Sequence, residues 1–294
     1  MSPQDTFLIG AHMSVSGGLS RALERAAAYD FNCVQLFTHS PRVWALTRTT
    51  PAACRTFQTV RKAHAMRCVI VHAPYLPNCA SVSPALWRRS CGVIARDVRL
   101  ADALGADYYV MHPGSVRGHT RTDGIARVAD ALAALCEPQP PALTFLLENT
   151  GSGGSLLGGA LDDLAEIMAA ARQRCPSMKF GMCLDTAHAF GAGYDLRSDT
   201  HVARLWRDIR RTVGADALKM IHANDTNAHV GSGRDVHAHI GQGRIGRSGF
   251  ARLMALPRLR RIPWILETPK DTPESDARNA ATLRAIFAET RRRR

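Results

Sequence analysis

The chain has 294 residues, of which 46% are hydrophobic; this excludes global disorder, and no apolar run is long enough to span a bilayer. Lysine and arginine outnumber aspartate and glutamate by 38 to 25, a formal net charge of +13, to which the terminal Arg291–Arg294 contribute four charges. A basic chain favours an anionic partner, above all nucleic acid, and the alternative is an arginine-rich proteome that adds charge to all its proteins.

Eight short apolar runs follow one another along the chain, and each is nearly continuous rather than alternating. Such runs are typical of strands covered on both faces, as in a parallel sheet. The predicted strands are Phe7–His12, Cys33–Thr38, Cys68–Pro74, Tyr108–Gly114, Thr144–Thr150, Phe180–His188, Leu218–Asp225 and Pro263–Pro269.

Helical patterns separate these runs. The clearest cover Gly17–Asp30, Pro84–Ala106 and Gly159–Cys175, and others follow Pro51, Thr122, Ser198, Ser248 and Pro273. The alternation predicts an α/β fold, a single (β/α)8 TIM barrel over residues 1–294, with a flexible basic tail over residues 286–294. A doubly wound open sheet is the alternative, but no G-x-G-x-x-G motif follows the first strand.

The eight cysteines form no C-x-x-C pair, and several lie within apolar runs. We therefore expect reduced and mostly buried thiols. The first residues, MSPQDTFLIG, lack the basic start and long apolar segment of a signal peptide. We expect a cytoplasmic protein with no membrane partner.

Histidines and carboxylates recur where the predicted strands end. In a barrel these ends and the following loops form one rim, where active sites lie. The residues closing strands are His12, His72, His112, Glu148, Asp185, His222 and Glu267; beyond strands or in loops stand His188, Asp225, Asp235, His237 and His239. Any one of them is more often a structural residue, so the prediction rests on their recurrence at one rim.

Carboxylates crowded at one rim repel one another, and divalent cations relieve that repulsion. Mixed histidine and carboxylate ligands suit Zn²⁺, with Mn²⁺ and Fe²⁺ as alternatives, and more than four ligands imply more than one ion. Adjacent metals commonly act on phosphate esters. Asp185 and His188 can both face the rim if the chain bends after Asp185, whereas Asp235 and His237, two residues apart, can share an ion.

Several motifs, in order from Gly10 to about Thr268, resemble those of the endonuclease IV family, the metal-dependent apurinic/apyrimidinic (AP) endonucleases of base-excision repair. The motifs are GAHMSVSGGL (10–19), MHPGS (111–115), LLENT (146–150), GMCLDTAHAFGAGYD (181–195), HANDTNAHVGSGRDVHAHIGQGRIG (222–246) and ILET (265–268).

The resemblance implies a single barrel with three Zn²⁺ ions, with Mn²⁺ possible at one site. His72 and His112 would hold the first ion, with Glu148 bridging to the second. The implied ligands of the second are Glu148, Asp185, His222 and Glu267, and those of the third are His188, Asp235 and His237. Glu148 would also be catalytic, because it would orient the attacking hydroxide.

The implied reaction is hydrolysis of double-stranded DNA 5′ to an abasic site, leaving a 3′-hydroxyl and a 5′-deoxyribose phosphate. The same chemistry would trim 3′-blocked ends. Arg42 in FTHSPRVW and Tyr75 and Leu76 in HAPYLPN would contact DNA around an extruded nucleotide, and ordinary loop packing is an equal alternative for each. The family implies a monomer with no obligate protein partner, associated with the nucleoid when bound to DNA.

Three departures from the family pattern bear on DNA affinity rather than on the metal site: Val236 replaces an arginine, Asn227 replaces a lysine, and Gly151–Gly154 replaces a G-Q-G stretch. His12, Asp225 and His239 are not ligands in this scheme; His12 and Asp225 would support ligands, and His239 would be a loop residue. The alternatives are a metal-dependent sugar isomerase or epimerase on the same barrel, and a DNA-binding relative without catalysis.

Overall fold

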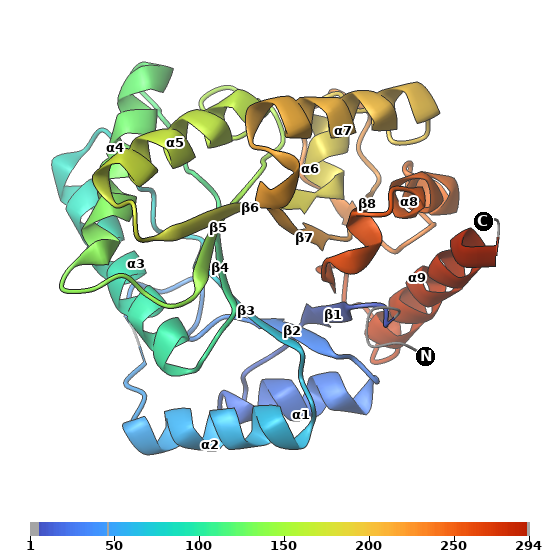
Figure 1. The fold of residues 1–294 in the computed structure, drawn as a ribbon, viewed down its shortest axis with the longest axis horizontal. Coiled ribbons are helices and arrows are strands. Elements are labelled where there is room, and N and C mark those ends of the chain that lie inside the picture. Colours follow the sequence, from blue (N-terminus) through green and yellow to red (C-terminus); the bar gives the residue numbers. More distant parts are fainter. Residues whose placement is uncertain (1–5, 46, 293–294) are drawn as a thin grey trace.

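The computed structural model describes residues 6–45 and 47–292, and its central feature is a closed barrel of eight parallel strands (Figure 1). Around the barrel the strands follow the order β1-β10-β7-β6-β5-β4-β3-β2. They are β1 (Ile9–His12), β2 (Cys33–Leu36), β3 (Cys68–His72), β4 (Tyr108–Met111), β5 (Thr144–Glu148), β6 (Lys179–Asp185), β7 (Leu218–His222) and β10 (Trp264–Leu266). The predicted (β/α)8 barrel is confirmed.

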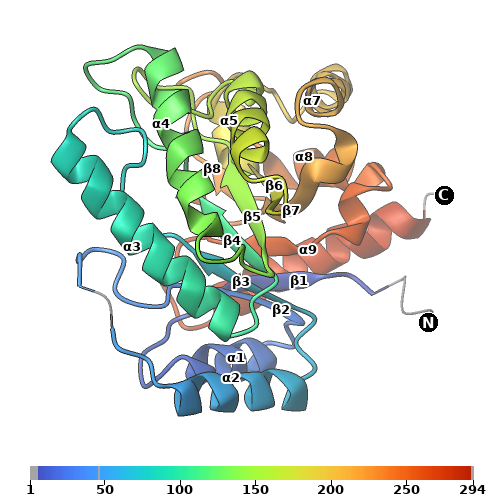
Figure 2. The same cartoon turned by 60° about the vertical axis from the view of Figure 1, so that its left-hand side comes forward.

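Helices connect successive strands and surround the barrel (Figures 1 and 2). They are α1 (Ser20–Ala28), α2 (Pro51–Ala63), α3 (Pro84–Ala103), α4 (Arg121–Ala133), α5 (Leu161–Arg174), α6 (Thr186–Gly191), α7 (Asp199–Thr212), α8 (Gly246–Ala255) and α9 (Ser275–Arg292), with 3-10 turns η2 (Ala134–Cys136), η3 (Ala215–Ala217) and η4 (Leu259–Arg261). A short antiparallel pair, β8 (Asp225–Thr226) and β9 (His237–Ala238), stands between β7 and α8. Among the described residues no helix is long and apolar enough to cross a membrane.

Local sequence explains where several helices begin. The hydroxyl oxygens of Thr50, Ser83 and Thr120 each accept a backbone N–H three residues further on, at 3.2, 3.4 and 3.1 Å. Proline follows the cap at Pro51 and Pro84, where its missing N–H costs no helical hydrogen bond.

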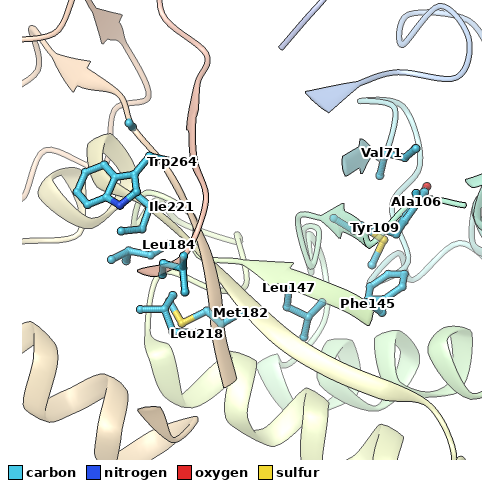
Figure 3. Packing of buried hydrophobic residues seen from close by; sticks show 14 of the residues in the cluster. Val71, Ala106, Tyr109, Phe145, Leu147, Met182, Leu184, Leu218, Ile221 and Trp264 are labelled. Carbon is cyan, nitrogen blue, oxygen red and sulfur yellow. The ribbon is translucent and has the colours of Figure 1, made fainter. Parts of the chain in front are cut away.

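The strands separate two buried layers because successive side chains point to opposite faces. A small cluster fills the barrel interior, with members from seven strands: Cys33, Cys68, Ile70, Val110, Leu146, Cys183, Met220 and Ile265. The alternate positions pack outward against the helices in a larger cluster that includes Val71, Tyr109, Leu147, Leu184 and Trp264 (Figure 3). The barrel is therefore a filled core, and its polar residues can gather only beyond the strand ends.

The structure corrects the expectation of a flexible tail over residues 286–294. Helix α9 continues through Arg292, Ile286 is buried, and the ring of Phe287 stacks on Phe7 with centroids 4.3 Å apart. These apolar residues fix the last turns of the helix to the barrel. Residues 293 and 294 lie outside the described residues.

The expectation of reduced cysteines is wrong for one pair. Cys136 and Cys175 form a disulfide, with Cα atoms 6.4 Å apart, and the other six cysteines are free. Cys136 ends the 3-10 turn after α4, and Cys175 follows α5 directly. Because α4 and α5 pack side by side, these two ends meet (Figure 1).

Candidate metal centre

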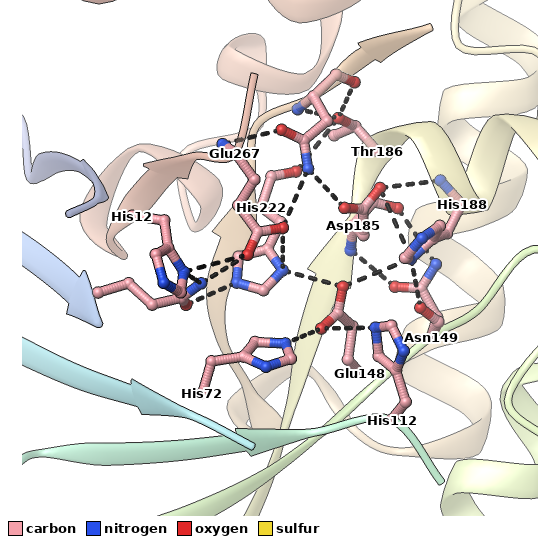
Figure 4. A network of polar contacts seen from close by, with 12 residues as sticks. His12, His72, His112, Glu148, Asn149, Asp185, Thr186, His188, His222 and Glu267 are labelled. Atoms are coloured by element: carbon pink, nitrogen blue, oxygen red, sulfur yellow. Dashed lines mark hydrogen bonds and ion pairs between the residues drawn. The ribbon is translucent and has the colours of Figure 1, made fainter. Parts of the chain in front are cut away.

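The strand register carries polar side chains from seven strands to one rim of the barrel. Each stands two residues after a member of the interior cluster, so it points toward the barrel axis one step beyond the apolar core. These residues are Gln35, His72, His112, Glu148, Asp185, His222 and Glu267. Figure 4 shows most of them converging from different strands.

Glu148 lies at the centre of this group and is fully buried. Its Oε2 is 3.2 Å from Nε2 of His72 and 3.2 Å from Nε2 of His112. Its other oxygen, Oε1, is 2.9 Å from Nδ1 of His222 and 3.4 Å from Nδ1 of His188 (Figure 4). One carboxylate therefore faces two separate pairs of imidazoles.

Three groups of potential ligands meet at the rim; the first two contain the residues predicted for the first and second ions, and the third contains two of the three predicted for the third ion. His72, His112 and Glu148 form one, and Glu148, Asp185, His222 and Glu267 form the second; within each group the potential ligand atoms lie within 4.8 Å of one another. Asp185, His188 and His237 form the third under the same limit. Asp235 joins it through Oδ2, 3.2 Å from Nε2 of His188, and Oδ1, 3.0 Å from Nε2 of His237.

Strand β6 is shorter than the predicted strand, so His188 reaches the rim from a helix. Strand β6 ends at Asp185, whose Oδ1 accepts the backbone N–H of His188 at 2.8 Å and so begins the short helix α6. The predicted bend after Asp185 is this helix start.

Backbone carbonyls fix the rings of three histidines. Nδ1 of His72 lies 2.7 Å from the Ala73 carbonyl. Nδ1 of His188 lies 2.9 Å from the Asn149 carbonyl, and Nδ1 of His237 lies 3.1 Å from the Glu267 carbonyl. A carbonyl only accepts, so Nδ1 carries the hydrogen, and the neutral ring offers Nε2 to a ligand.

Two asparagines, to which the sequence patterns assigned no role, hold Asp185. Asn224 donates from Nδ2 to Oδ2 of Asp185 at 2.6 Å, and its Oδ1 accepts the backbone N–H of Glu267 at 3.0 Å. Asn149 accepts the N–H of Asp185 at 2.7 Å. Their positions directly after Glu148 and two residues after His222 were the only signal in the sequence.

The charges of the site depend on one another. Burial opposes ionisation of Glu148, but the imidazoles of His222 and His112 outweigh it and hold the pKa of Glu148 well below its usual value. Burial also disfavours the imidazolium of His237, yet Asp235 and Asp185 outweigh it and raise the pKa of His237 to about 9. Burial likewise opposes the cationic form of His188, and Asp185, Asp235 and Glu148 raise its pKa well above the ordinary value.

The donor set fits divalent cations. Imidazole nitrogens and carboxylate oxygens converge at short distances, and they are the ligands that zinc takes in hydrolytic sites. Nε2 of His237 is buried, and although Oδ1 of Asp235 lies 3.0 Å away, the angles do not make a hydrogen bond, so this nitrogen has no hydrogen-bond partner among the described residues. A nitrogen aimed into a cluster of acids without a hydrogen bond is a position that a cation would complete.

A cavity of about 320 Å³ opens beside the cluster. Its walls include His72, His112, His188 and Asp235 from the cluster, Tyr75, Leu76 and Asn78 from the loop after β3, and Ser115, Thr150 and Leu156. The described residues with exposed large apolar side chains are Val43, Tyr75, Leu156 and Val230, and all lie in loops at this rim. Of these four, Tyr75 and Leu156 line the cavity.

Two of the three predicted DNA-contact residues line this cavity. Tyr75 is 62% exposed, and Leu76 lies beside it in the wall. The backbone N–H of Tyr75 donates to the Pro41 carbonyl at 3.1 Å, which ties its loop to the loop after β2. Arg42 is exposed on that second loop but does not line the cavity.

The residues expected to be non-ligands lie outside the three groups. His12 contacts Gln35 and Glu267, at 3.1 and 3.9 Å, and so supports a potential ligand. His239 contacts Asp271 at 3.1 Å in the loop region. Asp225 accepts backbone N–H groups of a following loop, from Gly241 at 2.9 Å and Ile245 at 2.9 Å, so it orders that loop.

Comparisons with known proteins agree with this geometry. The family described as "Xylose isomerase-like TIM barrel" matches residues 23–287. A protein named "Probable endonuclease 4" from Nitratidesulfovibrio vulgaris is 41% identical over 283 residues, 95% of this chain and 98% of the relative. Another of that name, from Halothermothrix orenii, is 35% identical and covers 89% and 93% of the two chains.

Solved structures also match nearly the whole chain. The crystal structure of endonuclease IV from Thermus thermophilus matches with a TM-score of 0.83 and 34% identity, covering 96% of this chain and 99% of that one. A D-tagatose 3-epimerase-like protein matches with a TM-score of 0.70 at 17% identity, over 97% and 98% of the chains. At that identity the second likeness shows a shared fold alone.

Proposed function

Because this chain belongs to the endonuclease IV family, and is therefore a nuclease, we propose that it is a zinc-dependent AP endonuclease acting in base-excision repair. It cuts double-stranded DNA 5′ to an abasic site and leaves a 3′-hydroxyl and a 5′-deoxyribose phosphate. The same centre removes blocking groups from 3′ ends. It works on chromosomal DNA in the cytoplasm, without an obligate protein partner.

Nine residues hold three Zn²⁺ ions in this proposal, one of which Mn²⁺ can replace. His72, His112 and Glu148 hold the first ion, while Glu148, Asp185, His222 and Glu267 hold the second. His188, Asp235 and His237 hold the third. Bound zinc supplies a hydroxide at neutral pH and charge stabilisation for a phosphate ester. The proposal is supported by the convergence of these side chains.

Glu148 is the catalytic carboxylate in this proposal. The low pKa caused by His222 and His112 keeps it ionised, so it accepts hydrogen bonds and orients the attacking oxygen. His72 and His112 hold one of its oxygens, and His222 the other, which leaves the carboxylate little freedom to rotate.

The cavity beside the cluster receives the extruded sugar of an abasic site. An abasic nucleotide has no base to unstack, so it costs less to extrude than a normal one. Tyr75 and Leu76 occupy the gap left in the duplex, and Arg42 contacts the backbone from the neighbouring loop. The formal charge of +13 supports binding to the phosphates.

The observation that carries this proposal is the approach of Glu148, Asp185, His222 and Glu267 within 4.8 Å of one another. The test is incubation with a duplex that carries one abasic analogue, with the undamaged duplex as control. We expect incision 5′ to the lesion, its loss after prolonged chelation, and its return with Zn²⁺. Incision that survives complete removal of metal contradicts the zinc assignment, and turnover of ketose sugars without incision favours the epimerase alternative.

A further inference from the structure

We propose that Gln35 is a positioning residue that fixes which nitrogen of His222 faces the metal centre and holds Glu267 beside it. The inference rests on the proposed zinc binding. Gln35 is fully buried on β2, at the inward position two residues after Cys33. It stands as a polar residue inside the apolar run CVQLF, which was the one signal in the sequence.

The side chain of Gln35 contacts residues at the ends of three other strands. Nε2 donates to Oε1 of Glu267 at 2.6 Å and lies 3.1 Å from Nδ1 of His12. Oε1 lies 2.8 Å from Nε2 of His222. Figure 4 shows these partners, His12, His222 and Glu267, gathered on one side of the centre. Both N–H groups and the carbonyl oxygen of this buried amide therefore have partners.

The acids determine how the amide is oriented. The carboxylate of Glu267 only accepts hydrogen bonds, so the amino end of Gln35 must face it. The carbonyl end therefore faces His222, and because a carbonyl only accepts, Nε2 of His222 carries a hydrogen. The lone pair of the neutral ring is then on Nδ1.

Nδ1 of His222 points into the centre, 2.9 Å from Oε1 of Glu148 and 3.3 Å from Oε2 of Glu267. His72, His188 and His237 have the opposite arrangement, because carbonyls hold their Nδ1 and leave Nε2 available. Gln35 thus gives His222 a binding geometry that the other three do not have.

Loss of the amide affects both partners. Nε2–H of His222 would be buried without an acceptor, and Glu267 would lose the hydrogen bond that leaves its second oxygen facing the centre. Partners of this kind change metal affinity by roughly 10- to 100-fold when they are removed. A residue that only fills space would not change metal affinity in this way.

The test measures Zn²⁺ affinity by competition with a chelator in the full-length chain, Gln35→Met and Gln35→Leu. Leu36→Met is the matched control, because Leu36 is buried on the same strand but packs outward. We expect zinc at the second site, whose proposed ligands include His222 and Glu267, to bind about 10- to 100-fold less tightly in both Gln35 variants, with no change in the control. We also expect kcat at limiting zinc to fall while KM for the abasic duplex stays the same.

A second readout follows the ring nitrogens of zinc-loaded protein by ¹⁵N NMR. The unsubstituted protein should show one histidine bound through Nδ1 with a hydrogen-bonded Nε2–H, and Gln35→Met should lose that signal. Gln35→Glu keeps an oxygen facing His222 and should retain it. Unchanged zinc affinity together with an unchanged ring signal in Gln35→Met and Gln35→Leu overturns the inference. If the unsubstituted protein binds no zinc, the proposed function fails instead.

Discussion

Oδ1 of Asp185 accepts the backbone N–H of His188 at 2.8 Å, so a potential metal ligand also caps the helix that carries another. The cap turns the chain from β6 into α6 and aims His188 at the same cluster. Asn is an equally good cap but has no charge.

Substitution of Asp185 should therefore separate capping from metal binding. We expect Asp185→Asn to lose zinc and at least ~100-fold in incision rate, because the charged ligand is gone. Asp185→Ala should lose the same activity and be less stable than Asp185→Asn by about 0.5–2 kcal/mol, because the cap is also lost. Metal analysis and urea unfolding check both, and equal stability of the two variants would rule out the capping role.

Glu148→Gln should reduce incision by at least ~10²-fold and leave the fold and DNA binding largely intact. The reason is that the amide keeps the size of the carboxylate but removes the charge shared by His72, His112 and His222. Single-turnover incision and DNA-binding titration measure the two effects separately. Near-normal turnover in this variant would contradict the catalytic assignment.

Tyr75→Ala should weaken binding of the abasic duplex by about 5- to 150-fold, the range expected from loss of one aromatic stacking contact. Tyr75→Phe keeps the ring and is the matched control, so it should bind like the unsubstituted protein. Zinc content should be the same in both variants, because Tyr75 is 62% exposed and lies outside the ligand groups. Equal binding by all three proteins would show that Tyr75 does not contact DNA and only packs within its loop.

Arg42→Ala should weaken binding to damaged and undamaged DNA by similar factors. A phosphate contact carries no sequence information, and its loss should lower the salt dependence of binding by about one unit of slope. Titrations at several salt concentrations measure this slope. An unchanged slope would show that Arg42 does not contact the backbone.

Reduction of the Cys136–Cys175 disulfide should lower the free energy of unfolding by about 3–4 kcal/mol, because the bridge closes a long loop in the unfolded chain. Incision should not change, since both cysteines precede their strands, β5 and β6, and the metal cluster lies at the opposite ends. Urea unfolding with and without reductant measures the effect, and Cys136→Ser/Cys175→Ser should not respond. Eight titratable thiols in the unreduced, unfolded protein would show that the bridge is absent.

The barrel could be predicted from the sequence because apolar runs alternate with helical patterns, and most of the site because the ends of parallel barrel strands meet at one rim. Histidines and acids that close the apolar runs, such as His112 and Glu148, were therefore expected at that rim, and in the structure they lie within one group. His188 does not follow this rule, because it reaches the cluster through α6.

Other features depended on contacts that no local pattern records. Gln35 contacts His222, which is 187 residues away, so its importance appears only when β2 and β7 face each other across the barrel. The disulfide depends on how α4 and α5 pack, and the order of the last turns of α9 depends on Ile286 and Phe287 meeting the barrel.

Glu148 belongs to two ligand groups at once, since its oxygens face different imidazole pairs. Under the proposed three-zinc assignment the two ions on either side of it cannot be loaded independently, because both groups share this one carboxylate. Loading should then be cooperative. In a cell short of zinc, the population of this enzyme would then consist of fully metal-loaded molecules and inactive ones, rather than of molecules that are all slowed to the same degree.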